Sequence, residues 1–204
     1  MGRTSNAKER LKEAVIDLVW LGSFAGTKID DICNRAGVKK GSFYYFYESK
    51  SALLIDALEE IHEDWILKLN AAFSPLHSGL ERLRIKADLG YAEQVKLFER
   101  YGRVPGCPIF TIGSDCVVVE PEVTKKIQGW IREYTKFIES AIRDAHLAGE
   151  IDAPDTAATA SVLLSYWQGI LAQARIQNDL ELLRNAGAGA ERILRVKSSQ
   201  PSAA

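Results

Sequence analysis

Residues 27–50 read TKIDDICNRAGVKKGSFYYFYESK, and this stretch decides the fold. Its apolar spacing predicts a short helix opened by Thr27, with Thr27 and Asp30 at the spacing of a capping box. Gly37 then supplies a turn of positive φ, and Val38 fills the corner before a second short helix. The stretch therefore predicts a helix-turn-helix, and the buried stripe of its first helix is Ile29, Ile32, Cys33 and Ala36.

The second short helix, expected over residues 39–47, carries five aromatic residues in succession at positions 43–47. At about 100° per residue, Phe43 and Tyr47 face inward, whereas Ser42 and Tyr45 face away from the core. A single core cluster is the alternative, but five consecutive helical residues cannot all face one side. Small, hydroxyl and ammonium groups on the outer face suit the approach of phosphates and base edges. The residues that predict such contact are Lys39, Lys40, Gly41, Ser42 and Tyr45.

Charge is distributed unevenly along the 204 residues, whose formal net charge is −1. Residues 1–50 hold nine Lys and Arg against six Asp and Glu, a net of +3 that leaves −4 for the remainder. A basic N-terminal part on an acidic body is typical of proteins that bind nucleic acid through one part only. No apolar run reaches the ~20 residues of a membrane helix, and the N-terminal residues lack the apolar segment of a signal peptide. We therefore expect a cytoplasmic protein that does not enter a membrane.

These residues together resemble the N-terminal domain of the TetR/AcrR family of repressors. The signature stands as Ala36-Gly37-Val38-Lys39-Lys40-Gly41-Ser42-Phe43-Tyr44, then Tyr47 and Ser49-Lys50, about a quarter of the chain with its flanks. Two positions depart from the family pattern, because Phe46 replaces a frequent His or other polar residue and Lys39 replaces a frequent Ser or Thr. The resemblance implies double-stranded DNA as the partner. It also implies DNA contacts by Thr27, Ser42, Tyr44, Tyr45 and Lys50.

The remainder of the chain is expected to be helical. Amphipathic periodicity predicts helices over residues 6–21, 49–73, 80–101, 121–148, 155–177 and 180–196. With the resemblance, this predicts an all-α fold. Its parts are a three-helix helix-turn-helix DNA-binding domain (residues 1–48), a helical regulatory, ligand-binding and dimerisation domain (residues 49–197) and a disordered tail (residues 198–204). The resemblance implies that the last two helices pair with their copies in a homodimer, and internal packing is the alternative. A smooth stripe suits a close helix pair, and it consists of Ala157, Ser161, Ser165 and Gly169.

Motifs of enzymatic chemistry are absent from the sequence. It contains no phosphate-binding glycine loop, HExxH or GxSxG, and its three histidines fall on different predicted elements. We therefore expect no catalytic residue, no metal site and no cofactor. The middle helices are rich in aromatic residues, which line pockets for small organic molecules but equally suit a core. The candidates for the site of an unidentified small-molecule effector are Trp65, Phe98, Tyr101, Cys107, Phe110, Trp130, Tyr134 and Trp167.

Two alternatives stay open beside the main expectation, which is a homodimeric repressor released from a pseudo-palindromic operator by its effector. Cys107 lies between Gly106 and Pro108 at a break in the helical pattern. Some members of the family sense oxidants or electrophiles through cysteine, so a sensor acting through Cys107, with Cys116 as a second thiol, is the first alternative. A structural cysteine competes with it. The second alternative is a small helical enzyme or interaction adaptor whose N-terminal domain has lost its affinity for DNA.

Overall fold

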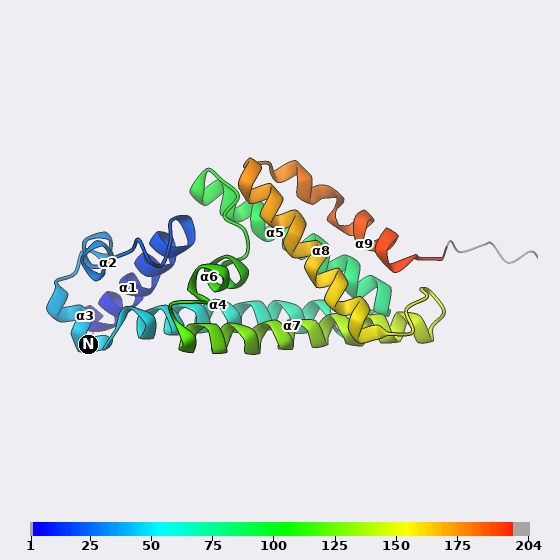
Figure 1. Cartoon of the computed structure of the whole chain (residues 1–204), viewed down its shortest axis with the longest axis horizontal. Coiled ribbons are helices and arrows are strands. Elements are labelled where there is room, and N and C mark those ends of the chain that lie inside the picture. Colours follow the sequence, from blue (N-terminus) through cyan, green and yellow to red (C-terminus); the bar gives the residue numbers. More distant parts are fainter. Residues whose placement is uncertain (1, 198–204) are drawn as a thin grey trace, which may run out of the picture. The chain divides into compact units, whose positions relative to one another are not determined.

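A computed structural model of the chain describes residues 2–197, and every regular element in this range is a helix (Figure 1). The predicted all-α fold is thereby confirmed. The tail predicted over residues 198–204 lies outside the described residues. The helices are α1 (Gly2–Leu21), α2 (Ile29–Ala36), α3 (Lys40–Phe46), α4 (Lys50–Ala72), α5 (Gly79–Tyr101), α6 (Pro108–Cys116), α7 (Pro121–Leu147), α8 (Thr156–Gln177), the 3-10 helix η1 (Leu180–Asn185) and α9 (Ala186–Leu194).

The helices gather into two compact units. The first comprises Met1–Ile66 with Cys107–Ile131, and the second comprises Leu67–Gly106 with Arg132–Ala204. The long helices α4 and α7 contribute to both units, and α6 belongs to the first. The predicted domain boundary after residue 48 stays a prediction, and the division into units is a separate feature. The sequence offers no signal for it, because buried residues continue along both long helices past the points where the units divide.

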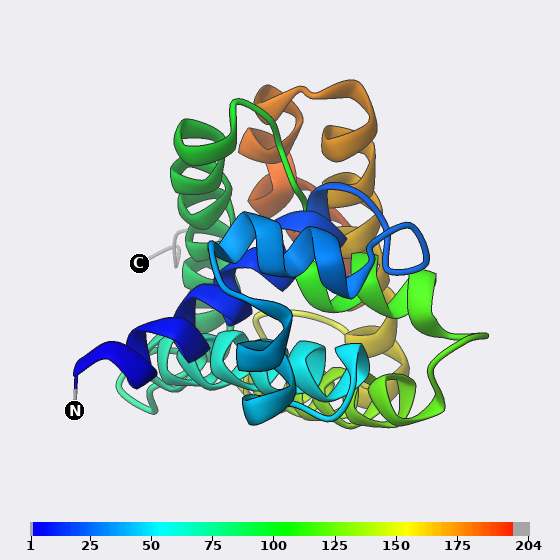
Figure 2. The same ribbon diagram turned by 90° about the vertical axis from the view of Figure 1, so that its left-hand side faces the viewer.

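In the first unit, α1 packs against α2, α3 and α6, and Figure 2 turns the first three of these helices toward the viewer. Helices α2 and α3 meet at Gly37, whose φ of 62° and ψ of 39° are the left-handed conformation predicted for this turn. The Val38 amide donates to the Cys33 carbonyl at 3.0 Å and closes the end of α2. Side chains at the centre of the unit are fully buried, and they are Leu11, Val15, Ile32, Phe43, Leu53, Leu54 and Leu58.

Two predicted helix starts in this unit are wrong. Helix α1 begins at Gly2 instead of residue 6. Thr27 does not cap α2, because the N-cap residue is Lys28, whose backbone N–H donates to the Asp31 carboxylate at 2.9 Å. Thr27 is buried and donates its hydroxyl to the Ser23 carbonyl at 2.7 Å. A buried hydroxyl needs a hydrogen-bond partner, and here the preceding loop provides that partner instead of the helix.

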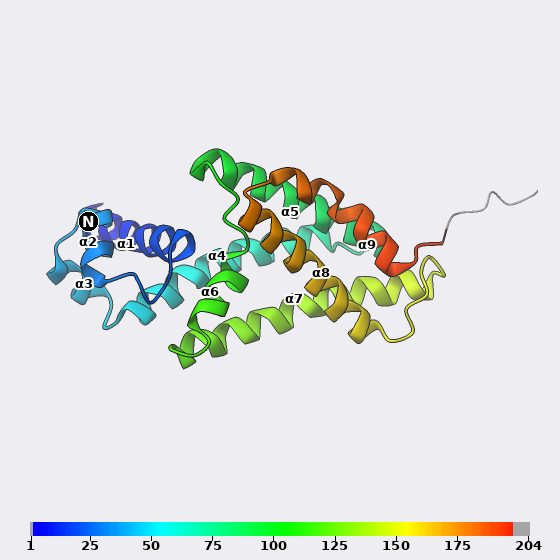
Figure 3. The same cartoon turned by 45° about the horizontal axis from the view of Figure 1, so that its top comes forward.

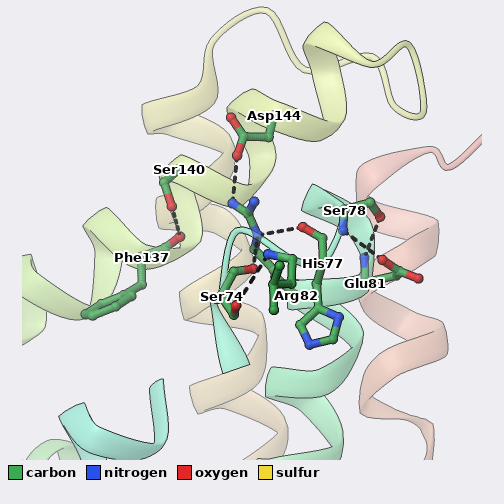
Figure 4. Close-up of polar contacts among 9 residues, drawn as sticks. Ser74, His77, Ser78, Glu81, Arg82, Phe137, Ser140 and Asp144 are labelled. Carbon is green, nitrogen blue, oxygen red and sulfur yellow. Dashed lines mark hydrogen bonds and ion pairs between the residues drawn. The ribbon is translucent and has the colours of Figure 1, made fainter. Parts of the chain in front are cut away.

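The second unit is organised around the start of α5. The Ser78 hydroxyl accepts the Glu81 N–H at 3.2 Å, and the Glu81 carboxylate accepts the Ser78 N–H at 2.7 Å, which completes a capping box. Arg82 donates through Nε to two carbonyls of the preceding loop at 3.1 and 3.0 Å. Its Nη1 donates to the Asp144 carboxylate at 2.6 Å (Figure 4). Arg82 therefore joins the connection between α4 and α5 to α7.

Helices α8, η1 and α9 pack together in this second unit, and η1 and α9 also pack against α5. Figures 1 and 3 both show α9 beside α5. The single helix predicted over residues 180–196 is wrong, because η1 and α9 occupy this segment. The Asp179 carboxylate accepts the Glu181 N–H at 2.9 Å and begins the tighter 3-10 helix. The glycine-rich start of α9 has little helix propensity, and burial of Ala186 and Ala190 stabilises it.

The described residues contain neither a membrane-spanning helix nor a metal-binding cluster. Between residues 2 and 197, no helix is both long enough and apolar enough to cross a membrane. In the same part of the chain, no group of three or more His, Cys, Asp or Glu side chains is arranged to hold a metal ion.

Candidate nucleic-acid interface

Helix α3 has one buried face and one open face, as the sequence predicts. Phe43 is 0% exposed, and Tyr47, which ends the helix, is 7% exposed. On the other side, Tyr45 is 75% exposed and Tyr44 is 54% exposed. Neighbouring aromatic rings in contact with water are typical of a surface that meets another molecule. The open face of α3 is therefore the leading candidate for a binding surface in the first unit.

Contacts within α3 hold both exposed rings. Tyr44 lies edge-on to Phe43 with the ring centroids 5.3 Å apart, and Tyr45 lies edge-on to Phe46 at 4.9 Å. Such contacts contribute about 1 kcal/mol each beyond the burial of area. Rings held in this way lose little further freedom on binding. Phe46, where the family often has a polar residue, thus supports Tyr45.

Gly41 places no side chain on the open face of α3, and packing within the chain does not explain this glycine. It is exposed, and a Cβ atom added there meets nothing within 4 Å. Alanine would fit this position and would favour a helix by about 1 kcal/mol. Packing within the chain therefore does not require glycine, whereas the close approach of another molecule would.

Basic groups border this face at the start of α3. Lys39 and Lys40 are both exposed, and Ser42 is half-buried beside them. The Lys40 ammonium lies 2.8 Å from the Asp30 carboxylate, and this hydrogen bond raises the pKa of Lys40. Exposed ion pairs are weak, so a phosphate can replace the carboxylate.

Two of the predicted DNA contacts lie inside the unit. Lys50, the first residue of α4, donates to the carbonyls of Phe24 at 2.6 Å and Thr27 at 2.7 Å. Its Nζ also lies 3.8 Å from the centroid of the Phe24 ring, and burial lowers the pKa of Lys50. Because the Thr27 hydroxyl bonds within the same loop, both side chains hold the connection between α1 and α2 in this conformation. Their contacts with DNA stay predictions.

Carboxylates from the segment of α6 and α7 hold the same region. Asp115 of α6 accepts the backbone N–H of Phe24, and Glu120 accepts the Ser51 hydroxyl at 2.6 Å. These partners are 91 and 69 residues apart in the sequence. Sequence reasoning missed them because no local pattern signals a pair over such a separation.

The eight predicted effector residues are divided between the two units. Trp130 stacks on the buried His62 ring with centroids 4.8 Å apart, and Phe98 packs against a hydrophobic cluster that includes Ala174. For these two residues the interpretation as core is supported. The effector site itself stays a prediction, and its residues are Trp65, Cys107, Phe110 and Trp130 in the first unit, with Phe98, Tyr101, Tyr134 and Trp167 in the second.

Trp167 has an unusual environment among these residues. It is buried, and the Lys86 ammonium lies 3.7 Å from the centroid of its ring. Its indole N–H is buried without a hydrogen-bond partner among the described residues. Such a buried donor costs about 1–3 kcal/mol, which an acceptor on a bound molecule would recover.

The three cysteines differ in their surroundings. Burial raises the pKa of Cys33, and it raises the pKa of Cys116 to about 12. Cys107 is only half-buried and is the N-cap residue of α6. The N–H groups at a helix N-terminus stabilise a thiolate. Cys107 is the most accessible of the three thiols, and its side chain accepts no capping hydrogen bond from α6.

Two family models match the chain. One, described as the tetracyclin repressor-like C-terminal domain, matches residues 79–189, which is more than half of the chain. The other, described as bacterial regulatory proteins of the tetR family, matches residues 13–57. The second match contains α2 and α3, so it falls on the helices that carry the candidate interface.

Individual regulators are similar to the chain in sequence. The HTH-type transcriptional regulator RutR of Escherichia coli (strain K12) is 29% identical over 135 residues, and the chain spans 63% of its length, with 63% of the chain matched. The HTH-type transcriptional repressor NemR of the same strain is 25% identical over 174 residues, which are 84% of the chain and 85% of NemR.

Solved structures share the fold. The crystal structure of E. coli NemR in its reduced form matches with a TM-score of 0.77 at 21% identity and covers 94% of this chain and 98% of NemR. A TetR-family regulator from Agrobacterium tumefaciens matches with a TM-score of 0.83 at 14% identity, over 96% and 100% of the two chains. At these identities the likeness concerns the fold alone, whereas the family models identify the sequence itself. The chain belongs to the TetR family of bacterial transcriptional regulators.

Proposed function

We propose that the protein is a repressor whose homodimer binds a pseudo-palindromic operator through the open faces of its two α3 helices, and that a small-molecule effector releases it. The contrast on α3 between the fully buried Phe43 and the open Tyr45 carries this proposal. A helix-turn-helix inserts such a helix in the major groove, where its outward side chains contact base edges. NemR is named a repressor, which supports the direction of regulation.

The proposed DNA contacts divide into two groups. Lys39 and Lys40 contact phosphates, which positions the helix on the duplex. Thr27 and Lys50 join them only after the α1–α2 loop rearranges, because their polar groups hold that loop. The second group is the open face of α3, which contacts base edges and the nearest sugar-phosphate backbone. It consists of Gly41, Ser42, Tyr44 and Tyr45.

The outer face of α8 supports the homodimer. Val162 is 55% exposed and Ile176 is 82% exposed on this helix, which buries neither side chain within the chain. A second copy would cover them, and exposed small residues on the same helix allow a close approach of helices. Two protomers would then present their α3 helices to half-sites about 34–36 Å apart. The small residues are all exposed, and they are Ala157, Ser161, Ser165 and Gly169.

Val162→Glu tests the dimer. A charge buried in the α8 interface should convert the protein to a monomer at micromolar concentration in sedimentation velocity. Leu76→Glu, at a site 91% exposed outside this face, is the matched control and should leave the dimer intact. An unchanged sedimentation coefficient for Val162→Glu would contradict the placement of the dimer interface on α8.

Release by the effector requires that the effector bind the released state more tightly than the DNA-bound state. The unsatisfied indole N–H of Trp167 supports an effector that carries a hydrogen-bond acceptor. Lys86, over the same ring, adds a positive charge and so supports an acidic acceptor. Within the second unit, the predicted residues available to line its site beside Trp167 are Tyr101 and Tyr134.

Gly41→Ala tests the DNA interface because it separates stability from binding. A duplex selected from a randomised DNA library by the full-length protein serves as the probe, and fluorescence anisotropy at fixed salt measures its affinity. The methyl group should weaken binding at least about tenfold, since it occupies the space of the approaching backbone or base. It should also raise the free energy of unfolding by up to about 1 kcal/mol.

Gly90→Ala is the matched control for this experiment. Gly90 lies within α5, and a Cβ atom there also meets nothing within 4 Å. The control should gain stability and keep its affinity for DNA. Equal affinities of Gly41→Ala and the unmodified protein would refute the interface.

A second candidate function is release from DNA by covalent modification of Cys107. The position of Cys107 as N-cap of α6 favours it, because Asp115 on that helix bonds to the α1–α2 loop. Cys107→Ser separates the two functions. With N-ethylmaleimide as the electrophile, a sensor loses the selected duplex while its Cys107→Ser variant keeps it. Equal behaviour of the two proteins would rule out this mode of release.

A further inference from the structure

Asp56 of α4 lies where three helices of the first unit meet. Its Oδ2 accepts the hydroxyl of Tyr47, the residue that ends α3, at 2.6 Å. The same oxygen lies 2.9 Å from the ammonium of Lys8 on α1, and that ammonium is 5.6 Å from the centroid of the Tyr47 ring. One carboxylate therefore joins α4 to both α3 and α1.

A second ion pair joins α1 to α4 one turn further along. The Lys12 ammonium lies 2.6 Å from Oε2 of Glu60. Lys8 and Lys12 are four residues apart, as are Asp56 and Glu60, so the two pairs are successive rungs between the same helices. Of these two rungs, the one at Asp56 also receives a hydrogen bond from the end of α3. Variants of Glu60 therefore affect only the contact between α1 and α4, whereas variants of Asp56 also affect the position of α3.

Tyr47 is well placed to transmit the effect of Asp56 to α3. Its ring is buried, with its centroid 6.2 Å from that of Phe43 and 6.5 Å from that of Phe46. Helix α3 has seven residues, so contacts at its ends decide its direction. A hydrogen bond from a hydroxyl to a carboxylate is stronger than one between neutral groups. The bond between Tyr47 and Asp56 thus fixes the C-terminal end of α3 against α4.

We propose that Asp56 is a positioning residue for DNA recognition, which through its hydrogen bond with Tyr47 sets the direction in which α3 presents its open face. This inference rests on the proposed function, in which that face binds DNA. Asp56 does not touch DNA, and its effect passes through Tyr47. The ion pair with Lys8 is not required for the positioning.

Four single variants and one double variant test this role with the duplex selected by the full-length protein. Asp56→Ala and Tyr47→Phe should each weaken binding about tenfold, and the double variant should be no weaker than either one, because both remove the same hydrogen bond. Asp56→Asn keeps an acceptor for the Tyr47 hydroxyl and should restore binding to within about twofold. Glu60→Gln removes the other rung and should also stay within about twofold. All affinities are measured where urea titrations show each variant to be fully folded.

A purely structural role predicts a different set of results. In that case Asp56→Ala and Glu60→Gln would weaken binding equally, or Asp56→Asn would be as weak as Asp56→Ala, and either result would overturn the proposal. A different result would overturn the proposed function: if the unmodified protein selects no duplex, both the proposed function and the role of Asp56 are wrong. Tight binding by the unmodified protein with the pattern above supports both.

Discussion

Gly79→Ala should destabilise the second unit, and the structure indicates by how much. Gly79 is the first residue of α5, and a Cβ atom there would lie 2.5 Å from the backbone N of Ala145 and 3.0 Å from its Cβ. It would lie closer still to the carbonyl oxygen of Ala141. These are mostly backbone atoms of α7 and cannot rotate away. Since carbon and oxygen atoms approach to roughly 3.3 Å, the start of α5 must move away from α7 by about 1 Å.

Such overpacking costs about 1–3 kcal/mol, against a gain of up to about 1 kcal/mol from the helix propensity of alanine. The shift also strains the hydrogen bond of Arg82 to Asp144, which joins this region to α7. We expect a net loss of about 1–2 kcal/mol in the free energy of unfolding. Urea denaturation followed by far-UV circular dichroism measures it, at one protein concentration because association of subunits adds to the measured stability.

Gly90→Ala on the same helix is the control, and its expected sign is opposite. Apart from the adjoining backbone of α5, no atom lies within 4 Å of the added methyl group, so the substitution should stabilise the protein by about 0.5–1 kcal/mol. A Gly79→Ala variant that is as stable as Gly90→Ala would refute the close approach of α5 and α7.

Three further predictions concern single side chains. Lys50→Met should lower the free energy of unfolding by roughly 2 kcal/mol, measured by urea denaturation, because two carbonyls lose a charged donor; an unchanged value would contradict the anchoring role. Iodoacetamide followed by mass spectrometry should modify Cys107 well before Cys33 and Cys116, which are buried, and early modification of either buried thiol would contradict this order. Burial would raise the pKa of Asp56, but the hydrogen bonds from Tyr47 and Lys8 outweigh burial and lower this pKa. The ionised carboxylate therefore stabilises the fold above about pH 4, and this stabilisation is lost as the pH falls through the lowered pKa. The stability deficit of Asp56→Asn should therefore shrink on acidification in urea titrations at pH 3 to 6, and a constant deficit would be evidence against it.

The orientation of α3 could be predicted from the sequence because it depends on a local period. Helical residues advance by about 100°, which is enough to assign Phe43 to the core and Tyr45 to solvent. The turn at Gly37 was equally predictable, because the left-handed conformation favours glycine. Both features need only neighbouring residues, so one sequence contains them.

The partners of Lys50 and Thr27 could not be predicted in the same way. The family signature predicts a DNA contact for each, whereas the structure uses both side chains within the α1–α2 loop. Asp115, which bonds to that loop, comes from a helix far away in the sequence. Polar contacts between distant segments depend on tertiary packing, and no periodicity of a single sequence encodes them.

The break at Asn185 is a local feature that periodicity alone misses. Apolar residues continue on both sides of it, so their spacing predicts one helix. The hydrogen bond from Glu181 to the Asp179 side chain instead begins a 3-10 helix. The cap at Asp179 agrees with the predicted start at residue 180, so it does not signal the break at Asn185.

The affinity of Tyr45→Ala for the selected duplex tests the central claim, that the open face of α3 binds DNA, most directly. Tyr45 is 75% exposed, so its loss should leave the free energy of unfolding within about 0.5 kcal/mol of the original value. Its loss from a groove contact should weaken specific binding by about 1–3 kcal/mol, roughly tenfold or more at fixed salt. Sedimentation velocity should give the same assembly for both proteins. A variant that is folded, assembled and bound to the duplex as tightly as the unmodified protein would contradict the account.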